Sequence, residues 1–275
     1  MKVIVAQGSG FCFGVRRALE IVEKVLVEER GPFYTLGPLI HNLQVVERLS
    51  QKELKIIDNL KGIKEGTLII RSHGLPRAAI ELARKKGLRI IDATCPYVKR
   101  AQESARELEA GGYQLVIVGD RGHPEVKSMA SEKSIILQGP SQVEKIEFYP
   151  KMGVVAQTTQ SLENFKGIVK NLRKKTEELK VCATICSAVS RQQRATRKLA
   201  KEANLVLIIG GKNSANTKRL FQISKGFTET HHIERASEID PSWLRNKKMV
   251  GISAGASTPK WLIDEVAREV RGYDN

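Results

Sequence analysis

Three of the four cysteines stand in the same local sequence and recur at nearly regular intervals. Cys12, Cys95 and Cys186 are each followed by a valine three residues on and an arginine five residues on. Thiolates bind soft metal ions and iron–sulfur clusters, so three equivalent cysteines indicate one metal centre if the fold brings them together. Cys182 lies outside this pattern, and we expect it on the strand before Cys186 as a small buried apolar side chain.

Two further sets of polar residues follow each cysteine in register. The second set lies 28 or 29 residues after the cysteine, just beyond a glycine that ends a predicted strand: His41, His123 and Ser214. The third set is looser, 61 to 71 residues after the cysteine: His73, Thr158 and Ser257. This internal repeat predicts three units, each with three strand–turn–helix elements and a polar residue at every turn.

Short β-branched runs alternate with amphipathic segments along the chain, which predicts an α/β fold with parallel sheets. The expected strands are residues 3–6, 33–36, 67–70, 89–92, 115–118, 134–137, 153–156, 181–185, 205–209 and 249–252. We expect three similar lobes, 13–95, 96–185 and 186–275, with 1–12 packing on the third. Turns after parallel strands emerge at one sheet edge, where ligands bind. Lobes around a pseudo-threefold axis would therefore point these turns into one central cavity.

Three thiolates suit an iron–sulfur cluster better than zinc. Structural zinc sites have four protein ligands, usually in closely spaced pairs that this chain lacks, although a nearby histidine could complete such a site. A cluster on three cysteines keeps one iron without a protein ligand, and that iron can act as a Lewis acid. The spacing favours the cluster, and a zinc-dependent hydrolase of phosphate esters stays open as an alternative.

The polar residues near the cysteines suit an anion with several oxygens. His41, His73 and His123 can donate to phosphate oxygens, and the turns at 211–216 and 254–257 offer backbone N–H, hydroxyl and amide groups. Singly, each is explained as well by an ordinary helix cap or turn. Their matching offsets beside three cysteines favour a phosphate or diphosphate site.

Glu125 is the acid within these polar turns, while Asp120 upstream is expected to be a solvated turn residue. Beside a metal cluster a carboxylic acid can donate the proton that a leaving hydroxide needs. Thr158 would relay or orient that proton. Glu125 also has an ordinary interpretation, because His123-Pro124-Glu125 could be a helix cap, a first-turn proline and an acid that complements the helix dipole.

The formal net charge of +16 indicates an anionic partner, so a nucleic-acid-binding protein is a second hypothesis. No nucleic-acid-binding motif occurs, and aromatic residues make up only 5%, which leaves few stacking surfaces. The basic residues are spread over predicted helices, so we expect no nucleic-acid partner. Four cysteines are too few for a disulfide scaffold, and the apolar run at residues 3–6 is too short for a signal peptide or membrane span. We expect a cytoplasmic protein without a membrane partner, as a monomer or weak dimer.

The motifs around these residues resemble those of the 4-hydroxy-3-methylbut-2-enyl diphosphate reductases, which catalyse the last step of the non-mevalonate isoprenoid pathway. The matching segments run in order along the chain: GFCFGV (10–15), LGPLIHN (36–42), RSHG (71–74), DATCP (92–96), GHPEV (122–126), AQTTQ (156–160), TIC (184–186), KNSAN (212–216) and SAGAS (253–257). As a set they are highly specific for that family.

The resemblance implies one 4Fe–4S cluster per chain, on Cys12, Cys95 and Cys186, whose remaining iron binds the substrate hydroxyl. It implies reductive dehydroxylation of (E)-4-hydroxy-3-methylbut-2-enyl diphosphate to isopentenyl and dimethylallyl diphosphate. Glu125 with Thr158 would supply the proton that expels water, and reduced ferredoxin or flavodoxin would supply two electrons singly. The implied diphosphate contacts are His41, His73, His123, Ser214, Ala215 through its N–H, Asn216 and Ser257.

Three positions depart from the family pattern. Ala215 stands where many members have a second serine, which removes a hydroxyl contact but keeps the backbone N–H. Ala183 replaces a common Asp or Asn before the TIC motif, which removes a possible partner of the groups around the metal. Cys182 is an additional thiol. None of the three changes a cluster ligand or Glu125, so the expected activity stands.

Overall fold

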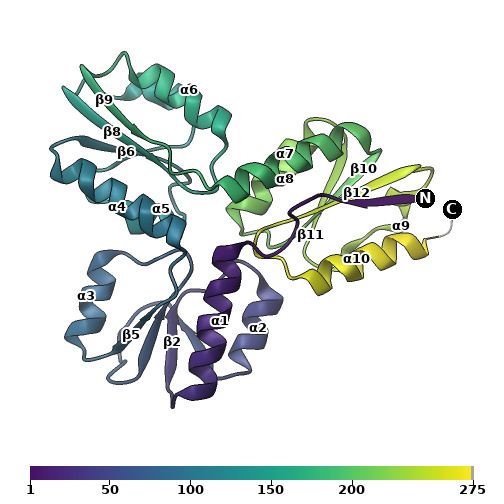
Figure 1. Cartoon of the computed structure of the whole chain (residues 1–275), viewed down its shortest axis with the longest axis horizontal. Coiled ribbons are helices and arrows are strands. Elements are labelled where there is room, and N and C mark those ends of the chain that lie inside the picture. Colours follow the sequence, from purple (N-terminus) through teal and green to yellow (C-terminus); the bar gives the residue numbers. More distant parts are fainter. Residues whose placement is uncertain (274–275) are drawn as a thin grey trace. The chain divides into compact units, whose positions relative to one another are not determined.

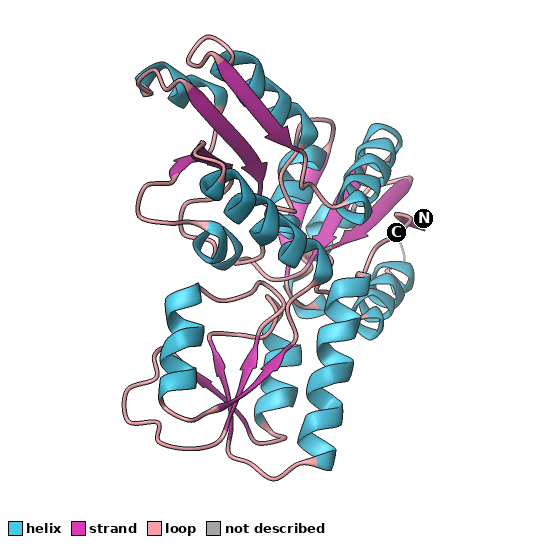
Figure 2. Cartoon of the chain, turned by 60° about the vertical axis from the view of Figure 1, so that its left-hand side comes forward, coloured by secondary structure: helices cyan, strands magenta, loops and turns pink. Residues whose placement is uncertain are grey.

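The computed structural model describes residues 1–273, which form three parallel sheets of four strands, each flanked by helices (Figure 1, Figure 2). The first sheet has the order β3-β2-β4-β5 and the second the order β7-β6-β8-β9. The third has the order β11-β10-β12-β1, so the N-terminal strand completes the last sheet by pairing with β12. The α/β class and the three parallel sheets predicted from the repeat are confirmed.

The strands of the first two sheets are β2 (Phe33–Leu36), β3 (Leu54–Ile57), β4 (Thr67–Ile70), β5 (Arg89–Asp92), β6 (Gln114–Val118), β7 (Ile135–Leu137), β8 (Lys151–Ala156) and β9 (Glu178–Cys182). Those of the third are β1 (Lys2–Val5), β10 (Leu205–Ile209), β11 (Glu229–Ile233) and β12 (Met249–Ala254). The helices are α1 (Phe13–Glu28), α2 (Leu43–Ser50), α3 (Arg77–Lys85), α4 (Pro96–Ala110), α5 (Pro124–Met129), α6 (Leu162–Leu172), α7 (Ser187–Glu202), α8 (Ala215–Lys225), α9 (Pro241–Leu244) and α10 (Lys260–Gly272). Two short 3-10 helices are η1 (Pro140–Lys145) and η2 (Ala236–Glu238).

Both faces of the third sheet are buried, which explains why its inner strand β10 is apolar at every position. Leu205 and Leu207 of β10 belong to the core shared with Val266 of α10. Val206, on the opposite face of the same strand, packs with Leu220 of α8. Parallel sheets covered by helices on two sides have this pattern.

The chain divides into two compact units. One consists of Met1–Arg16, Ile40–Glu47 and the C-terminal segment from Ser187, and it holds the third sheet. The other consists of Arg17–Leu39 and Arg48–Cys186, and it holds the first and second sheets. The boundaries of the three lobes stay a prediction.

Two strands were not predicted, and a third was displaced. β3 and β11 lie at sheet edges and carry polar residues, Lys55 in the first and Glu229-Thr230-His231-His232 in the second, so neither forms an apolar run. The strand predicted at 181–185 is β9 and ends at Cys182, because its pairing with β8 begins at Glu178. Cys186 therefore lies beyond the strand. The other predicted strands match to within two residues.

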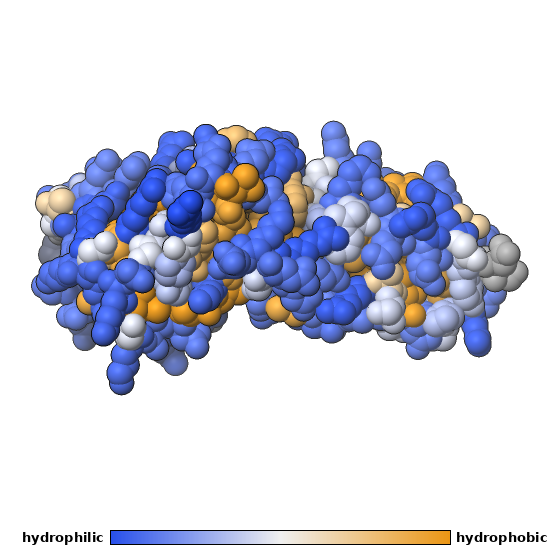
Figure 3. All heavy atoms as spheres, turned by 90° about the horizontal axis from the view of Figure 1, so that it is seen from below, coloured by the Kyte–Doolittle hydropathy of each residue, from blue (hydrophilic) through white to orange (hydrophobic). Residues whose placement is uncertain are grey.

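The face of the molecule shown in Figure 3 is mostly hydrophilic, with hydrophobic side chains between the hydrophilic ones. Within residues 1–273, no helix has both the length and the apolar character needed to cross a membrane.

Candidate active site

Each of the three repeated cysteines is anchored by its backbone N–H to the turn that follows the third strand in the order of its repeat. The bonds run from Cys12 N to Ala256 O (3.0 Å), from Cys95 N to Ser72 O (3.0 Å) and from Cys186 N to Thr158 O (2.9 Å). Every acceptor lies two residues after its strand, which is β12, β4 or β8 respectively. The three cysteines therefore have equivalent backbone positions beside three separate sheets, and each immediately precedes or caps a helix.

The three anchoring turns have the same hydrogen-bonded form. The closing bonds run from Gly74 N to Arg71 O (2.9 Å), from Gln160 N to Gln157 O (3.0 Å) and from Thr258 N to Gly255 O (3.0 Å). This register makes His73 equivalent to Thr159 and Ser257. The third polar set expected from the sequence paired His73 with Thr158, which lies one position earlier, because spacing from the cysteines cannot resolve a shift of one residue.

Glu125 is buried at the start of α5, with 2% of its surface exposed. Its carboxylate accepts two bonds from Thr158, one from the backbone N–H to Oε1 (2.5 Å) and one from the hydroxyl to Oε2 (2.9 Å). Burial raises the pKa of Glu125 from 4.5 to about 7, although the two bonds from Thr158 oppose that shift. A carboxyl group with this pKa can both hold and release a proton near neutrality.

His123 caps the same helix and is held as a neutral ring. Its Nδ1 accepts the backbone N–H of Glu125 at 3.1 Å. Burial, and then the positive charge of Arg71, lower the pKa of His123 from 6.5 to about 4. Since Nδ1 of the neutral ring is an acceptor here, Nε2 carries the hydrogen and is the donor atom.

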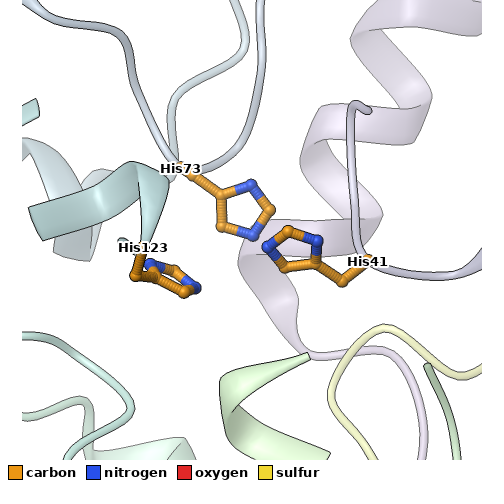
Figure 4. Close-up of side chains that lie close together, drawn as sticks. All are labelled: His41, His73 and His123. Carbon is orange, nitrogen blue, oxygen red and sulfur yellow. The ribbon is translucent and has the colours of Figure 1, made fainter. Parts of the chain in front are cut away.

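His73 lies against His123, with ring centroids 5.5 Å apart and ring planes at 84° (Figure 4).

Arg71 begins the turn that carries His73, and its side chain lies close to Gly37. Gly37 has a φ of +71°, and a Cβ there would lie 2.6 Å from an Arg71 guanidinium nitrogen. Any other residue at position 37 would be strained by the left-handed conformation, and its Cβ would collide with the Arg71 side chain.

Ser128 links the His73 turn to α5, a role that was not predicted. Its hydroxyl oxygen lies 2.7 Å from the Glu125 carbonyl and 3.3 Å from the His73 carbonyl, and it accepts a bond from Gln102 Nε2 at 2.9 Å. Ser128 has no counterpart in the repeat, so no signal in the sequence identifies it.

The unit that holds the third sheet contains five further predicted contacts of the diphosphate: His41, Ser214, Ala215, Asn216 and Ser257. The Ser257 hydroxyl donates to the carbonyl of His41 at 3.0 Å. Ser214 caps α8 by accepting the N–H of Thr217 at 3.3 Å, which leaves its own hydroxyl hydrogen available to a ligand. Ala215 is the first residue of α8, where N–H groups have no acceptor within the helix.

Asn216 is oriented by Gln192, a second residue that was not predicted. Gln192 Nε2 donates to the carbonyls of Gly8 (3.0 Å) and Ala254 (2.6 Å), so its Oε1 must be the atom that accepts from Asn216 Nδ2 at 2.8 Å. Asn216 Oδ1 is buried with no hydrogen-bond partner among the described residues. A buried acceptor of this kind favours a ligand that brings a donor.

The two departures next to Cys186 lie at the end of β9. Cys182 is its last residue and packs, partly buried, against the core that contains Leu108 and Val155. Ala183 follows it, and then Thr184 extends the contact with β8 through its hydroxyl, which accepts from Ala156 N (2.8 Å) and donates to Ala156 O (2.5 Å).

Three parallel sheets, each followed by an equivalent turn that accepts the N–H of one repeated cysteine, define an α/β protein with three equivalent cysteine positions. The chain belongs to the LytB protein family, whose model matches residues 3–271. It is 46% identical over 274 residues to the 4-hydroxy-3-methylbut-2-enyl diphosphate reductase of Geotalea daltonii, covering 98% of this chain and 97% of the relative. It is also 46% identical over 280 residues to the reductase of that name from Aquifex aeolicus, covering 98% and 96%.

Two solved structures share the fold. One, described as (E)-4-hydroxy-3-methyl-but-2-enyl diphosphate reductase, the terminal enzyme of the non-mevalonate pathway, is 45% identical with a TM-score of 0.70, covering 98% of this chain and 99% of that one. The other is the E-1-hydroxy-2-methyl-but-2-enyl-4-diphosphate reductase from Plasmodium falciparum. It is 27% identical with a TM-score of 0.92, covering 97% and 87%.

Proposed function

We propose that this chain reduces (E)-4-hydroxy-3-methylbut-2-enyl diphosphate to isopentenyl and dimethylallyl diphosphate. The reaction consumes two electrons and two protons and releases one water. The observation that carries the proposal is the arrangement around Thr158. This residue binds the buried carboxyl of Glu125 through its N–H and hydroxyl, while its carbonyl accepts the N–H of Cys186. One residue thus connects the buried acid to the backbone of a repeated cysteine, which supports a proton donor placed beside a cluster ligand.

Cys12, Cys95 and Cys186 fit a 4Fe–4S cluster. Their anchoring turns are equivalent, so each sheet would contribute one thiolate in the same manner, and no fourth cysteine belongs to the repeat. When bound, such a cluster supplies single electrons and one iron without a protein ligand that acts as a Lewis acid. Cys182 would not be a ligand, because it packs against the core of the second sheet.

Glu125 would supply the first proton. With a pKa of about 7, a substantial fraction of its carboxyl is protonated at neutral pH. The proton passes to the leaving hydroxide, which departs as water, and Thr158 keeps the carboxyl in place through the bond from its N–H. A second proton reaches carbon at either end of the allylic unit, which accounts for two products.

The diphosphate would be held by neutral donors. His123 donates through Nε2, and His41 and His73 would act alongside it. The start of α8 would add the Ser214 hydroxyl, the Ala215 N–H and the second Nδ2 hydrogen of Asn216, with Ser257 beside the His41 backbone. Helix N-termini bind phosphate groups through such N–H groups and the helix dipole.

Product analysis tests this proposal. We expect the anaerobic holoenzyme, reduced by dithionite, to convert the hydroxylated diphosphate into the two dehydroxylated diphosphates. Recovery of the substrate unchanged would contradict the reductase, and recovery of an alcohol with inorganic phosphate would favour a hydrolase.

A further inference from the structure

Half of the net charge of the chain is concentrated in one segment. Residues 187–225 contain nine lysines and arginines but a single acid, Glu202. The net charge of this segment, 9 − 1 = +8, is half of the formal net charge of +16. The segment comprises α7, β10 and α8.

Eight of these nine basic residues lie on α7 and α8, which cover one face of the third sheet, and Lys212 lies in the turn before α8. α7 and α8 are neighbours, joined by the bond between Gln192 and Asn216 (Figure 1). Arg191, Arg194 and Lys198 lie three and four residues apart on α7, so they share one face, and all three are exposed. Within residues 1–273, none of the three forms a salt bridge. Their positive charge is therefore presented to solvent.

This basic face adjoins a pocket that contains a proposed cluster ligand. The pocket has a volume of about 320 Å³, and its lining includes Cys12, Phe13, Arg16 and Arg191 but no carboxylate. Phe13 is 56% exposed, although it is a large apolar side chain. The surface around Cys12 thus combines an accessible aromatic ring with cations, which is a composition typical of protein interfaces.

We propose that an acidic one-electron carrier protein docks on the exposed face of α7 and over the Cys12 pocket. This rests on the proposed reductase function, which requires two electrons. Each docking event oxidises one carrier by one electron and reduces the enzyme by one, so two events serve one substrate molecule. The α7 cations would attract the carrier, and Phe13 would pack against it near the metal-binding thiol.

A protein fits this surface better than a nucleic acid. The cations of α7 continue through Arg191 into the lining of the pocket that holds Cys12, so they lie beside one of the proposed cluster ligands. A nucleic acid would gain nothing from that position.

A pair of charge reversals with a matched control tests the docking surface. The test variant is Arg194→Glu with Lys198→Glu on α7, neither of which lines the Cys12 pocket. The control is Lys166→Glu with Lys170→Glu, two exposed cations of α6 that make the same change in net charge on the second sheet. Glutamate is as good a helix former as lysine or arginine, so both variants should fold.

Three measurements on the anaerobic holoenzyme are compared: the KM for a reduced acidic ferredoxin, the calorimetric Kd for the oxidised ferredoxin, and the turnover with dithionite. We expect the α7 variant to raise KM and Kd by about tenfold or more, and the control by less than about twofold. Dithionite turnover should be unchanged in the control.

Equal increases in KM and Kd in both variants would show a general effect of net charge and would overturn the docking site. Larger increases in the α6 control would overturn it as well. Binding of a single-stranded RNA by the α7 face more tightly than ferredoxin, at about 0.15 M salt, would overturn the choice of partner. If the unmutated enzyme fails with dithionite as well, it is the reductase function that fails.

Discussion

Both hydrogen-bond donors of Thr158 point to the carboxylate of Glu125, the backbone N–H at 2.5 Å and the hydroxyl at 2.9 Å. These bonds stabilise the ionised form, whereas complete burial stabilises the protonated form, and burial prevails. The balance gives Glu125 a pKa near neutrality. Several predictions about the proposed reaction depend on this pair.

Glu125→Gln should lower kcat by at least about a hundredfold and leave KM for the substrate nearly unchanged, because the amide cannot donate the acidic proton. Steady-state kinetics with dithionite measure both constants. Glu103→Gln, an exposed residue of α4, is the control and should behave as the parent. Normal turnover in Glu125→Gln would show that Glu125 does not supply the proton.

The rate should fall as pH rises through about 7, because only protonated Glu125 can give up its proton and its pKa is about 7. A profile of kcat against pH at saturating substrate measures this limb. A rate that stays constant from about pH 6 to pH 9 would show that another group supplies the proton.

Stability should depend on Glu125 over a lower range of pH. The pKa of Glu125 is raised in the folded state, so its protonated form favours folding, and this contribution is present below about pH 4.5 and lost as pH rises to about 7. The loss is about 3 kcal/mol over that range. Guanidinium unfolding of the parent and of Glu125→Gln at several pH values should show a difference that changes across this window. A constant difference would contradict the raised pKa.

Thr158→Val removes the hydroxyl bond to Glu125 and keeps the backbone N–H. Since the hydroxyl bond lowers the pKa of Glu125, its loss should shift the falling limb of the rate profile to higher pH and reduce kcat. Thr158→Ser restores the hydroxyl and should restore the parent profile. If Thr158→Val and Thr158→Ser give the same pH–rate profile, the hydroxyl of residue 158 does not influence the pKa of Glu125.

Gly37→Ala should destabilise the fold and displace Arg71. The left-handed conformation costs alanine about 1–2 kcal/mol, and the new Cβ would lie 2.6 Å from the Arg71 guanidinium. Gly62→Ala is a matched control, because Gly62 has a φ of +80° with no atom within 4 Å of the added Cβ. Both variants should lose stability in guanidinium unfolding, but only Gly37→Ala should also raise KM for the substrate. A raised KM in Gly62→Ala would show that strain alone is responsible.

The sequence predicts the parts of the fold that the repeat encodes. Apolar runs and turn glycines recur at matching offsets after Cys12, Cys95 and Cys186, and this repeat indicated three parallel sheets. The edge strand β11 was missed because its residues Glu229-Thr230-His231-His232 are polar and form no apolar run. The supports of the site were missed for a different reason. Ser128 and Gln192 act through contacts between residues far apart in the chain, which spacing alone does not reveal.

The metal content of the anaerobically purified chain tests the central claim most directly. We expect about four irons per chain and a broad visible absorption in the parent and in Cys182→Ala, and loss of both in Cys186→Ala. Stoichiometric zinc without iron in the parent, or full iron content in Cys186→Ala, would contradict a cluster held by the three repeated cysteines.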